Sequence, residues 1–301
     1  MARSRGQILL VAAFALAVIF VALALILNTA IFTENLATRE TADGHDAIDF
    51  HESLLETGDI LLRVTNEEES SYEALVSSYR DRIDNYSDAE LAQGLTRGTL
   101  QNVTLLGTHN GTAINQSDGP TFESDRGNST WRLANDVTDT RAGTINVTDV
   151  DSNATVEFNA TNGSAQWKLA VNQTDSSTFG VSLETPTETR SKLFETDSLE
   201  IQPTNGSIEN ETWSDLKFQE AFPDGYDLWI RNGTNATGTY RLIVDKKASA
   251  IDWSAYNIDP ETDPRKTPAI YNATVQLELA REDLEYQANV TVAPEGSDPR
   301  R

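Results

Sequence analysis

The feature that most constrains this chain is an uncharged stretch of 27 residues, from Gln7 to Thr33. A helix needs roughly 20 apolar residues to cross the hydrocarbon core of a bilayer. Lipid offers the backbone no hydrogen-bond partners, so a spanning stretch of this length has to be helical. Arg3 and Arg5 precede it, and basic flanks stay in the cytoplasm. The sequence therefore predicts a single-pass protein of the cell membrane that contacts lipid, with a cytoplasmic N-terminus and an extracellular C-terminal domain.

Two other interpretations of this stretch remain open. A cleaved secretory signal usually has an apolar region of about 7–15 residues, which is shorter than this one. Arg5-Gly6-Gln7 followed by ILLVAAFALAVIF resembles the start of archaeal type IV pilin-like precursors, although Val11 stands where many of them have Glu. That resemblance implies a processing site between Gly6 and Gln7, with the helix kept for packing. The opening also resembles a set of uncharacterised haloarchaeal single-pass membrane proteins with an Arg-Gly-Gln N-terminus.

The charge of the chain indicates its surroundings. Asp and Glu number 47 against 23 Lys and Arg, which gives a net charge of −24. At molar salt the screening length falls to about 3 Å, so the self-repulsion of such a chain largely disappears. This acidic, lysine-poor composition resembles that of haloarchaeal proteins. It also argues against nucleic acid as a partner.

The sequence contains no cysteine, which excludes disulfides, thiolate zinc sites and cysteine nucleophiles. The exported part therefore has to be stabilised by its own core. With roughly 265 residues available, it can bury one large core or two smaller ones.

Asn-x-Ser/Thr sequons are the second strong signal, and 16 of the 21 asparagines belong to one. We expect several of them to carry glycans on an exported surface. The alternative is that Asn, Gly and Thr serve as turn and strand residues, as at the hairpin dipeptides Asn162-Gly163 and Asn232-Gly233. The possible sites are Asn85, Asn102, Asn110, Asn115, Asn128, Asn146, Asn153, Asn159, Asn162, Asn172, Asn205, Asn210, Asn232, Asn235, Asn272 and Asn289.

Residues 34–106 have helical periodicity. Ile48, Leu55 and Leu62 recur every seven residues and predict an apolar stripe that continues the anchor helix, as a stalk or against the rest of the chain. A second apolar face is predicted between the capping-box sequences Ser70-x-x-Glu73 and Ser87-x-x-Glu90, the latter opening a further helix. That face consists of Tyr72, Leu75, Val76, Tyr79, Ile83 and Tyr86.

Residues 107–293 have mainly the period of two that is typical of strands. After an expected loop at 108–130, three hairpins are predicted. They pair residues 156–160 with 167–171, residues 226–231 with 239–244, and residues 274–279 with 286–292. Hairpins in this arrangement favour an antiparallel sandwich.

The predicted fold class is accordingly α+β. An N-terminal transmembrane helix continues into a helical stalk or hairpin. After it comes an extracellular head that is β-rich, antiparallel and sandwich-like. The expected divisions are a basic leader (1–6), the transmembrane helix (7–33), the helical region (34–106), the β-rich domain (107–293) and a flexible tail (294–301).

The sequence contains little that indicates a reaction. His45, His51 and His109 lack metal-site spacing, and Asp149-x-Asp151-x-Asn153 has Ala154 where a calcium loop of the EF-hand type needs Gly. We therefore expect no catalytic residue, no metal site and no cofactor. The favoured function is a non-enzymatic, membrane-anchored extracellular protein of a halophilic archaeal envelope, with a structural or interaction role. One form of this role is a minor pilin-like protein that contacts other envelope or pilus-like proteins through its N-terminal helix. The alternative is a surface ligand-binding module or hydrolase, which a pocket with converging polar groups would favour.

Overall fold

The computed structural model describes residues 47–68, 71–117, 121–163, 165–222, 224–252, 256, 263–282 and 284–294. The described chain begins in a helix over residues 47–66, which we call the N-terminal helix. The further elements are α2 (Tyr72–Leu95), β1 (Leu100–Gln116), β2 (Trp131–Val137), β3 (Thr140–Val150), β4 (Val156–Thr161), β5 (Gln166–Asp175), β6 (Thr178–Glu184), β7 (Thr189–Glu195), β8 (Leu199–Gln202), β9 (Ser207–Ile208), β10 (Glu211–Thr212), η1 (Ser214–Leu216), η2 (Phe218–Ala221), β11 (Tyr226–Arg231), η3 (Gly233–Asn235), β12 (Ala236–Val244), η4 (Ala248–Ala250), β13 (Arg265–Arg281) and β14 (Leu284–Val292).

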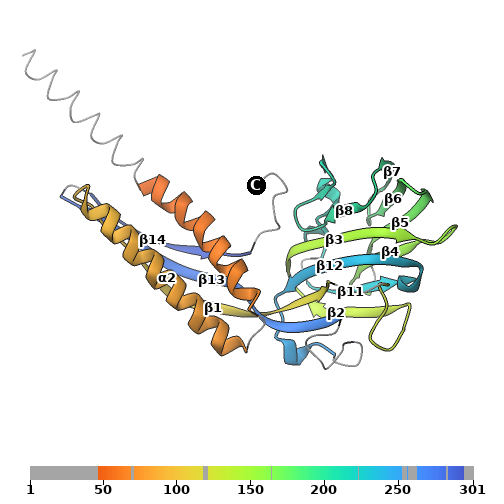
Figure 1. Cartoon of the computed structure of the whole chain (residues 1–301), viewed down its shortest axis with the longest axis horizontal. Helices are drawn as coiled ribbons and strands as arrows, with labels where there is room; N and C mark the ends of the chain where they lie inside the picture. Colours follow the sequence, from red (N-terminus) through yellow and green to blue (C-terminus); the bar gives the residue numbers. More distant parts are fainter. Residues whose placement is uncertain are drawn as a thin grey trace, which may run out of the picture.

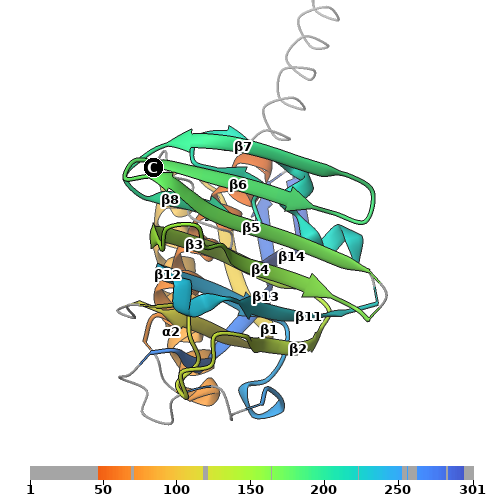
Figure 2. The same cartoon turned by 90° about the vertical axis from the view of Figure 1, so that its right-hand side faces the viewer.

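The strands form two antiparallel sheets. One has eight strands in the order β10-β9-β8-β3-β12-β1-β13-β14, and the other has six in the order β2-β11-β4-β5-β6-β7. Figure 2 shows the six-stranded sheet in front of the larger one, and the two share one apolar core. We call this paired region the sandwich. Its strands bury alternate residues, as in Gln166–Asp175, where Trp167, Leu169 and Val171 face inward.

The long strands β1 and β13 leave the sandwich and continue, with β14, into a three-stranded extension. The N-terminal helix and α2 lie along this extension, at the opposite end of the molecule from the six-stranded sheet (Figure 1). We call the two helices and the strand segments beneath them the helical layer. Its separate core includes Leu54, Leu75 and Tyr79 from the helices and Val275 and Leu277 from β13.

The order of the chain makes the sandwich an insertion. The helical layer is built from the first described helix, α2 and the start of β1, and then from the end of β13 and β14. The described residues between β1 and β13 belong to the sandwich. The register of the β1–β13 ladder shifts between Leu105 and Gly107 and again between His109 and Asn110, where the strands pass from one region to the other.

Helix α2 confirms the predicted apolar face. Leu75, Tyr79 and Ile83 are buried, and Tyr72, Val76 and Tyr86 pack around them. The helix begins after Ser71, whose side chain accepts a hydrogen bond from the Ala74 amide. The new helix expected at Ser87 does not exist, because α2 runs unbroken to Leu95. The buried Ser87 hydroxyl instead donates to Asn102 Oδ1 and accepts from the Val103 amide, which joins α2 to β1.

The predicted stripe on the N-terminal helix is only partly correct. Leu62 is buried, as is Leu54 beside Leu55, but Ile48 is 53% exposed and Leu55 is 38% exposed. The buried face is instead the one that carries Phe50, Leu54 and Gly58, because residues four apart share a face. A Cβ on Gly58 would lie 3.0 Å from the methyl carbons of Val292, so glycine lets the helix approach β14 closely.

The predicted fold class is wrong. The described chain is mostly β, and its two helices pack flat on a sheet instead of forming a stalk. The physical reason is that both helices have an apolar face broad enough to cover strands, which a free-standing stalk would leave in water. Within the described ranges no helix is long and apolar enough to span a membrane. The predicted transmembrane stretch, Gln7 to Thr33, lies outside them, as does nearly all of the predicted tail.

Two of the three predicted hairpins are confirmed. β4 pairs with β5, with Ala160 opposite Trp167, and β13 pairs with β14. The hairpin predicted for residues 226–231 and 239–244 is wrong, because β11 and β12 belong to different sheets. The expected loop at 108–130 is wrong over its first part, where β1 continues to Gln116.

Candidate functional site

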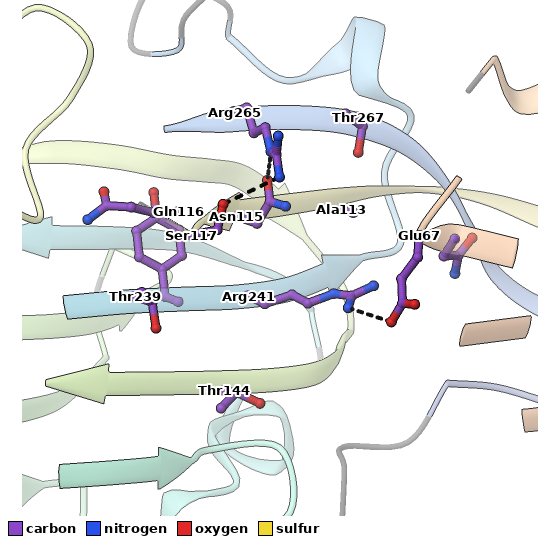
Figure 3. A pocket seen from close by; sticks show the side chains of 12 residues that line it. Glu67, Ala113, Asn115, Gln116, Ser117, Thr144, Thr239, Arg241, Arg265 and Thr267 are labelled. Atoms are coloured by element: carbon purple, nitrogen blue, oxygen red, sulfur yellow. Dashed lines mark hydrogen bonds and ion pairs between the residues drawn. The ribbon is translucent and has the colours of Figure 1, made fainter. Parts of the chain in front are cut away.

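A polar pocket of about 400 Å³ opens on the face of the eight-stranded sheet that points away from the six-stranded sheet. Its floor is a cross-strand row in which Thr144 on β3 lies opposite Arg241 on β12, Arg241 opposite Asn115 on β1, and Asn115 opposite Arg265 on β13. These side chains share a face because their neighbours Ile114, Tyr240 and Leu242 point into the sandwich core. We call this site the Arg241 pocket; Figure 3 shows its lining.

The turn after the N-terminal helix forms one wall of the pocket. Asn66, only 2% exposed, donates from Nδ2 to the Ile270 carbonyl at 2.9 Å, and its Oδ1 accepts from the Ile270 amide at 2.8 Å. β14 ends opposite Ala273, so the Asn66 amide takes the place that a further strand residue would have beside β13. This pair of bonds fixes the next residue, Glu67, at the mouth of the pocket.

Arg241 is the more accessible of the two cations. Its Nη1 lies 3.4 Å from Glu67 Oε1, and the two side chains are 34% and 53% exposed. Figure 3 shows the Arg241 side chain extending from β12 toward Glu67. An ion pair this long and this exposed contributes little to stability.

Arg265 is held more firmly. Its Nε donates to Asn115 Oδ1 at 3.0 Å, and Nη2 lies 3.4 Å from Ser117 Oγ. The Asp263 carboxylate, 8% exposed, lies 3.6 Å from Arg265 Nε and accepts from the Ser117 amide. Arg265 therefore has a nearly buried counter-charge and orients the Asn115 amide.

The remaining lining offers hydroxyl groups, from Thr144, Thr239 and Thr267. Guanidinium groups recognise carboxylates, and hydroxyl and amide groups both donate and accept hydrogen bonds. The arrangement can thus bind a polar molecule that carries a negative charge. A volume of this size and convergent polar groups are typical of small-molecule sites.

The predicted glycosylation sites are scattered over both regions of the molecule. Eight of the asparagines are exposed: Asn85, Asn102, Asn128, Asn153, Asn162, Asn210, Asn232 and Asn289. Seven are half-buried: Asn110, Asn115, Asn146, Asn172, Asn205, Asn235 and Asn272. Asn159 is 2% exposed within β4. The structure brings one of the sequons, Asn115-Gln116-Ser117, into the pocket.

The other predicted positions do not gather into a site. His51 lies on the N-terminal helix and His109 on β1, where it contacts the ring of Tyr271. The possible processing site, Gly6 and Gln7, lies outside the described residues, as does His45. Among the residues that the structure describes, no group of three or more His, Asp or Glu could hold a metal ion.

Sequence reasoning missed Arg241 and Arg265 as site residues. The available signal was their position: each is a cation with outward strand parity in a chain with only 23 Lys and Arg. The sequence does not show that these arginines converge on one site, because the site joins residues far apart in the chain. Asn115 and Arg265, for example, are 150 positions apart.

Comparison with known protein families matches residues 2–162 to a family described as Family of unknown function (DUF7261). This match covers more than half of the 301 residues. The chain belongs to DUF7261. The DUF7261 match spans the helical layer up to β1 and the first strands of the sandwich, and so includes Asn66, Asn115 and Thr144 but neither arginine. Comparisons with curated proteins and with solved structures gave no match.

Proposed function

We propose that this protein is a non-enzymatic, membrane-anchored extracellular protein of a halophilic archaeal envelope that acts by binding a ligand. The observation that carries the binding role is the Arg241 pocket, because polar groups from four strands and a helix turn converge there. The uncharged run near the N-terminus supports membrane attachment. The acidic composition and the many sequons support an exported, salt-adapted surface.

The topology fits a displayed binding module. The described chain begins in the helical layer, at residue 47, and the sandwich with its pocket is inserted between β1 and β13. A membrane attachment that precedes residue 47 thus joins the helical layer first. The sandwich then lies beyond that layer, where ligands in the medium reach it.

Fractionation of a haloarchaeal host that expresses the full chain tests the location. We expect the protein in the membrane fraction, and protease added to intact cells to cleave it. A chain that stays in the cytosolic fraction, or that protease cannot reach in intact cells but cleaves after lysis, would contradict the proposal. A matched variant without residues 7–33 should leave the membrane fraction.

A pilin-like role remains a second candidate, favoured by the Arg5-Gly6-Gln7 opening. It proposes cleavage between Gly6 and Gln7 and assembly with other envelope proteins. Mass spectrometry of the mature N-terminus tests it. A protein that begins at Gln7 supports this role, and one that begins at Met1 or Ala2 excludes it.

A further inference from the structure

The chemistry of the Arg241 pocket narrows the class of ligand, and this step rests on the proposed binding function. We propose that the pocket binds a carboxylated saccharide, with its carboxylate on Arg241 and its hydroxyl groups on the threonine and asparagine side chains. The contacts within the pocket supply three arguments for this assignment.

The first argument is that the pocket already holds a carboxylate. Glu67 Oε1 lies 3.4 Å from Arg241 Nη1, which is longer than the 2.7–2.9 Å of a strong charge-assisted bond. Glu67 is also more than half exposed, so water competes for both partners. A ligand carboxylate can therefore replace Glu67 and approach the edge of the guanidinium in its plane, with two parallel hydrogen bonds.

The second argument concerns the number of charges. Asp263, nearly buried, already balances Arg265, whereas the carboxylate that pairs with Arg241 among the described residues is the exposed Glu67. The pocket thus offers one replaceable counter-charge. This favours a ligand with a single negative group over a multiply charged one such as a phosphate ester.

The third argument is the space around Arg241. A carboxylate alone would fill a small part of about 400 Å³. Neighbouring strands lie about 4.8 Å apart, so the row from Arg241 across Asn115 to Arg265 extends over roughly 10 Å. That length accommodates a sugar ring with its carboxyl group. Thr144, Thr239, Thr267 and the Asn115 amide then face the hydroxyl groups of the ring.

Such a sugar could come from two sources. It could be a free saccharide, or it could belong to a glycan attached to Asn115, which lies on the floor of the pocket. Arg265 holds the oxygen of the Asn115 amide, so the nitrogen that glycosylation modifies is not the atom that Arg265 engages. The two sources share the same recognition chemistry and differ only in the covalent link.

The test uses the full chain, produced in a bacterial host that leaves Asn115 unmodified, in detergent and molar KCl. Sodium glucuronate is titrated and binding is followed by calorimetry and by saturation-transfer NMR, with glucose as the neutral probe. We expect glucuronate to bind at least tenfold more tightly than glucose. Equal affinity for the two sugars, or no binding of glucuronate, would overturn the proposal.

Three variants assign the contact. Arg241→Gln should weaken glucuronate binding at least tenfold, and Glu67→Gln should tighten it several-fold, because it removes the internal competitor. Arg190→Gln on β7 causes the same change of charge at the edge of the other sheet and should leave binding unchanged. If Arg241→Gln binds like the parent, or if Glu67→Gln weakens binding while its circular dichroism matches the parent, the assignment is wrong.

Protein purified from a haloarchaeal host distinguishes the sources. If mass spectrometry finds a glycan on Asn115, this protein should no longer bind glucuronate although the unmodified protein does. If Asn115 is bare, both preparations should bind it equally. The fractionation experiment has a separate readout. If glucuronate does not bind, the proposal of membrane attachment still stands, and if the protein is not in the membrane fraction, the proposal of binding in the pocket still stands.

Discussion

The helical layer and the sandwich protect the same long strands in different ways. In the helical layer, two helices that are adjacent in the sequence cover β1, β13 and β14. In the sandwich, the cover is a second sheet, in which β11 and β2 join the consecutive strands β4 to β7. The first cover is built within one segment of the chain, whereas the second also needs pairing between strands far apart in the sequence, such as β11 with β4. The following predictions test how far the two regions depend on each other.

The largest effect is expected from the core of the sandwich. Trp213 is fully buried beside Phe194, with ring centres 6.0 Å apart. Trp213→Ala should lower the free energy of unfolding by about 3–5 kcal/mol, through lost burial and the remaining cavity. Because β1 and β13 run through both regions, the circular dichroism of the helices and the fluorescence of the remaining tryptophans should change over the same range of denaturant. Two separate transitions, with the helices unaffected, would show that the regions fold independently.

Two glycines provide a matched pair across the regions. A Cβ on Gly233 in the sandwich would lie 2.1 Å from the backbone oxygen of Phe122, whereas one on Gly58 would lie 3.0 Å from the methyl groups of Val292. Gly233→Ala should cost about 1–3 kcal/mol, since backbone has to move. Gly58→Ala should be near neutral, because helix propensity gains about 1 kcal/mol and a side chain can adjust. Thermal unfolding of the two variants shows which loses more stability. A larger loss of stability in Gly58→Ala than in Gly233→Ala would contradict the prediction.

The junction between the regions depends on Asn66. Asn66→Ala removes two buried hydrogen bonds and leaves the Ile270 amide and carbonyl unpaired, which should cost about 1–3 kcal/mol. Hydrogen exchange at Ile270 should speed up as well. Glu67→Gln, one residue further along, is the control and should change stability by less than about 1 kcal/mol. Equal stability of the two variants would show that the turn does not hold the regions together.

The smallest effect is a dependence of stability on pH, and it comes from one residue near the start of β13, in the sandwich. Lys266 is buried, and burial lowers its pKa to about 8, against about 10.4 in an unfolded chain. Between these values the unfolded chain binds more protons than the folded one, so stability should rise as pH increases from about 8 to 9.5. Lys266→Met should reduce this slope in urea titrations at several pH values. An unchanged slope would exclude Lys266 as its source.

The distance along the chain between contacting residues explains what the sequence predicted. The face of α2 and the hairpin around Asn162-Gly163 follow from residues close together, and both are confirmed. The pairing of β11 and β12 failed because each finds a better partner far along the chain, β4 and β3 respectively. Ile48 and Leu55 had the right spacing, but spacing alone does not show which side of a helix meets a sheet.

The candidate site was the least predictable part. Its floor joins residues from four strands, and register between distant strands cannot be read from one sequence. Asn115 was recognised only as a sequon, and Arg241 and Arg265 have no motif around them. The one deducible feature was that a polar pocket, if present, would favour a binding role over a purely structural one.

The insertion of the sandwich between β1 and β13 also has a mechanical consequence. A pulling force applied between the N-terminal helix and β14 passes through the helical layer, where a Cβ on Gly58 would lie 3.0 Å from the methyl carbons of Val292. The sandwich lies outside this load path, so tension on the ends of the described chain would peel helix from strand and displace the wall formed by Asn66 and Glu67 before it deformed the sheet floor of the Arg241 pocket. That floor would then keep its arrangement under strain that already loosens the base of the molecule.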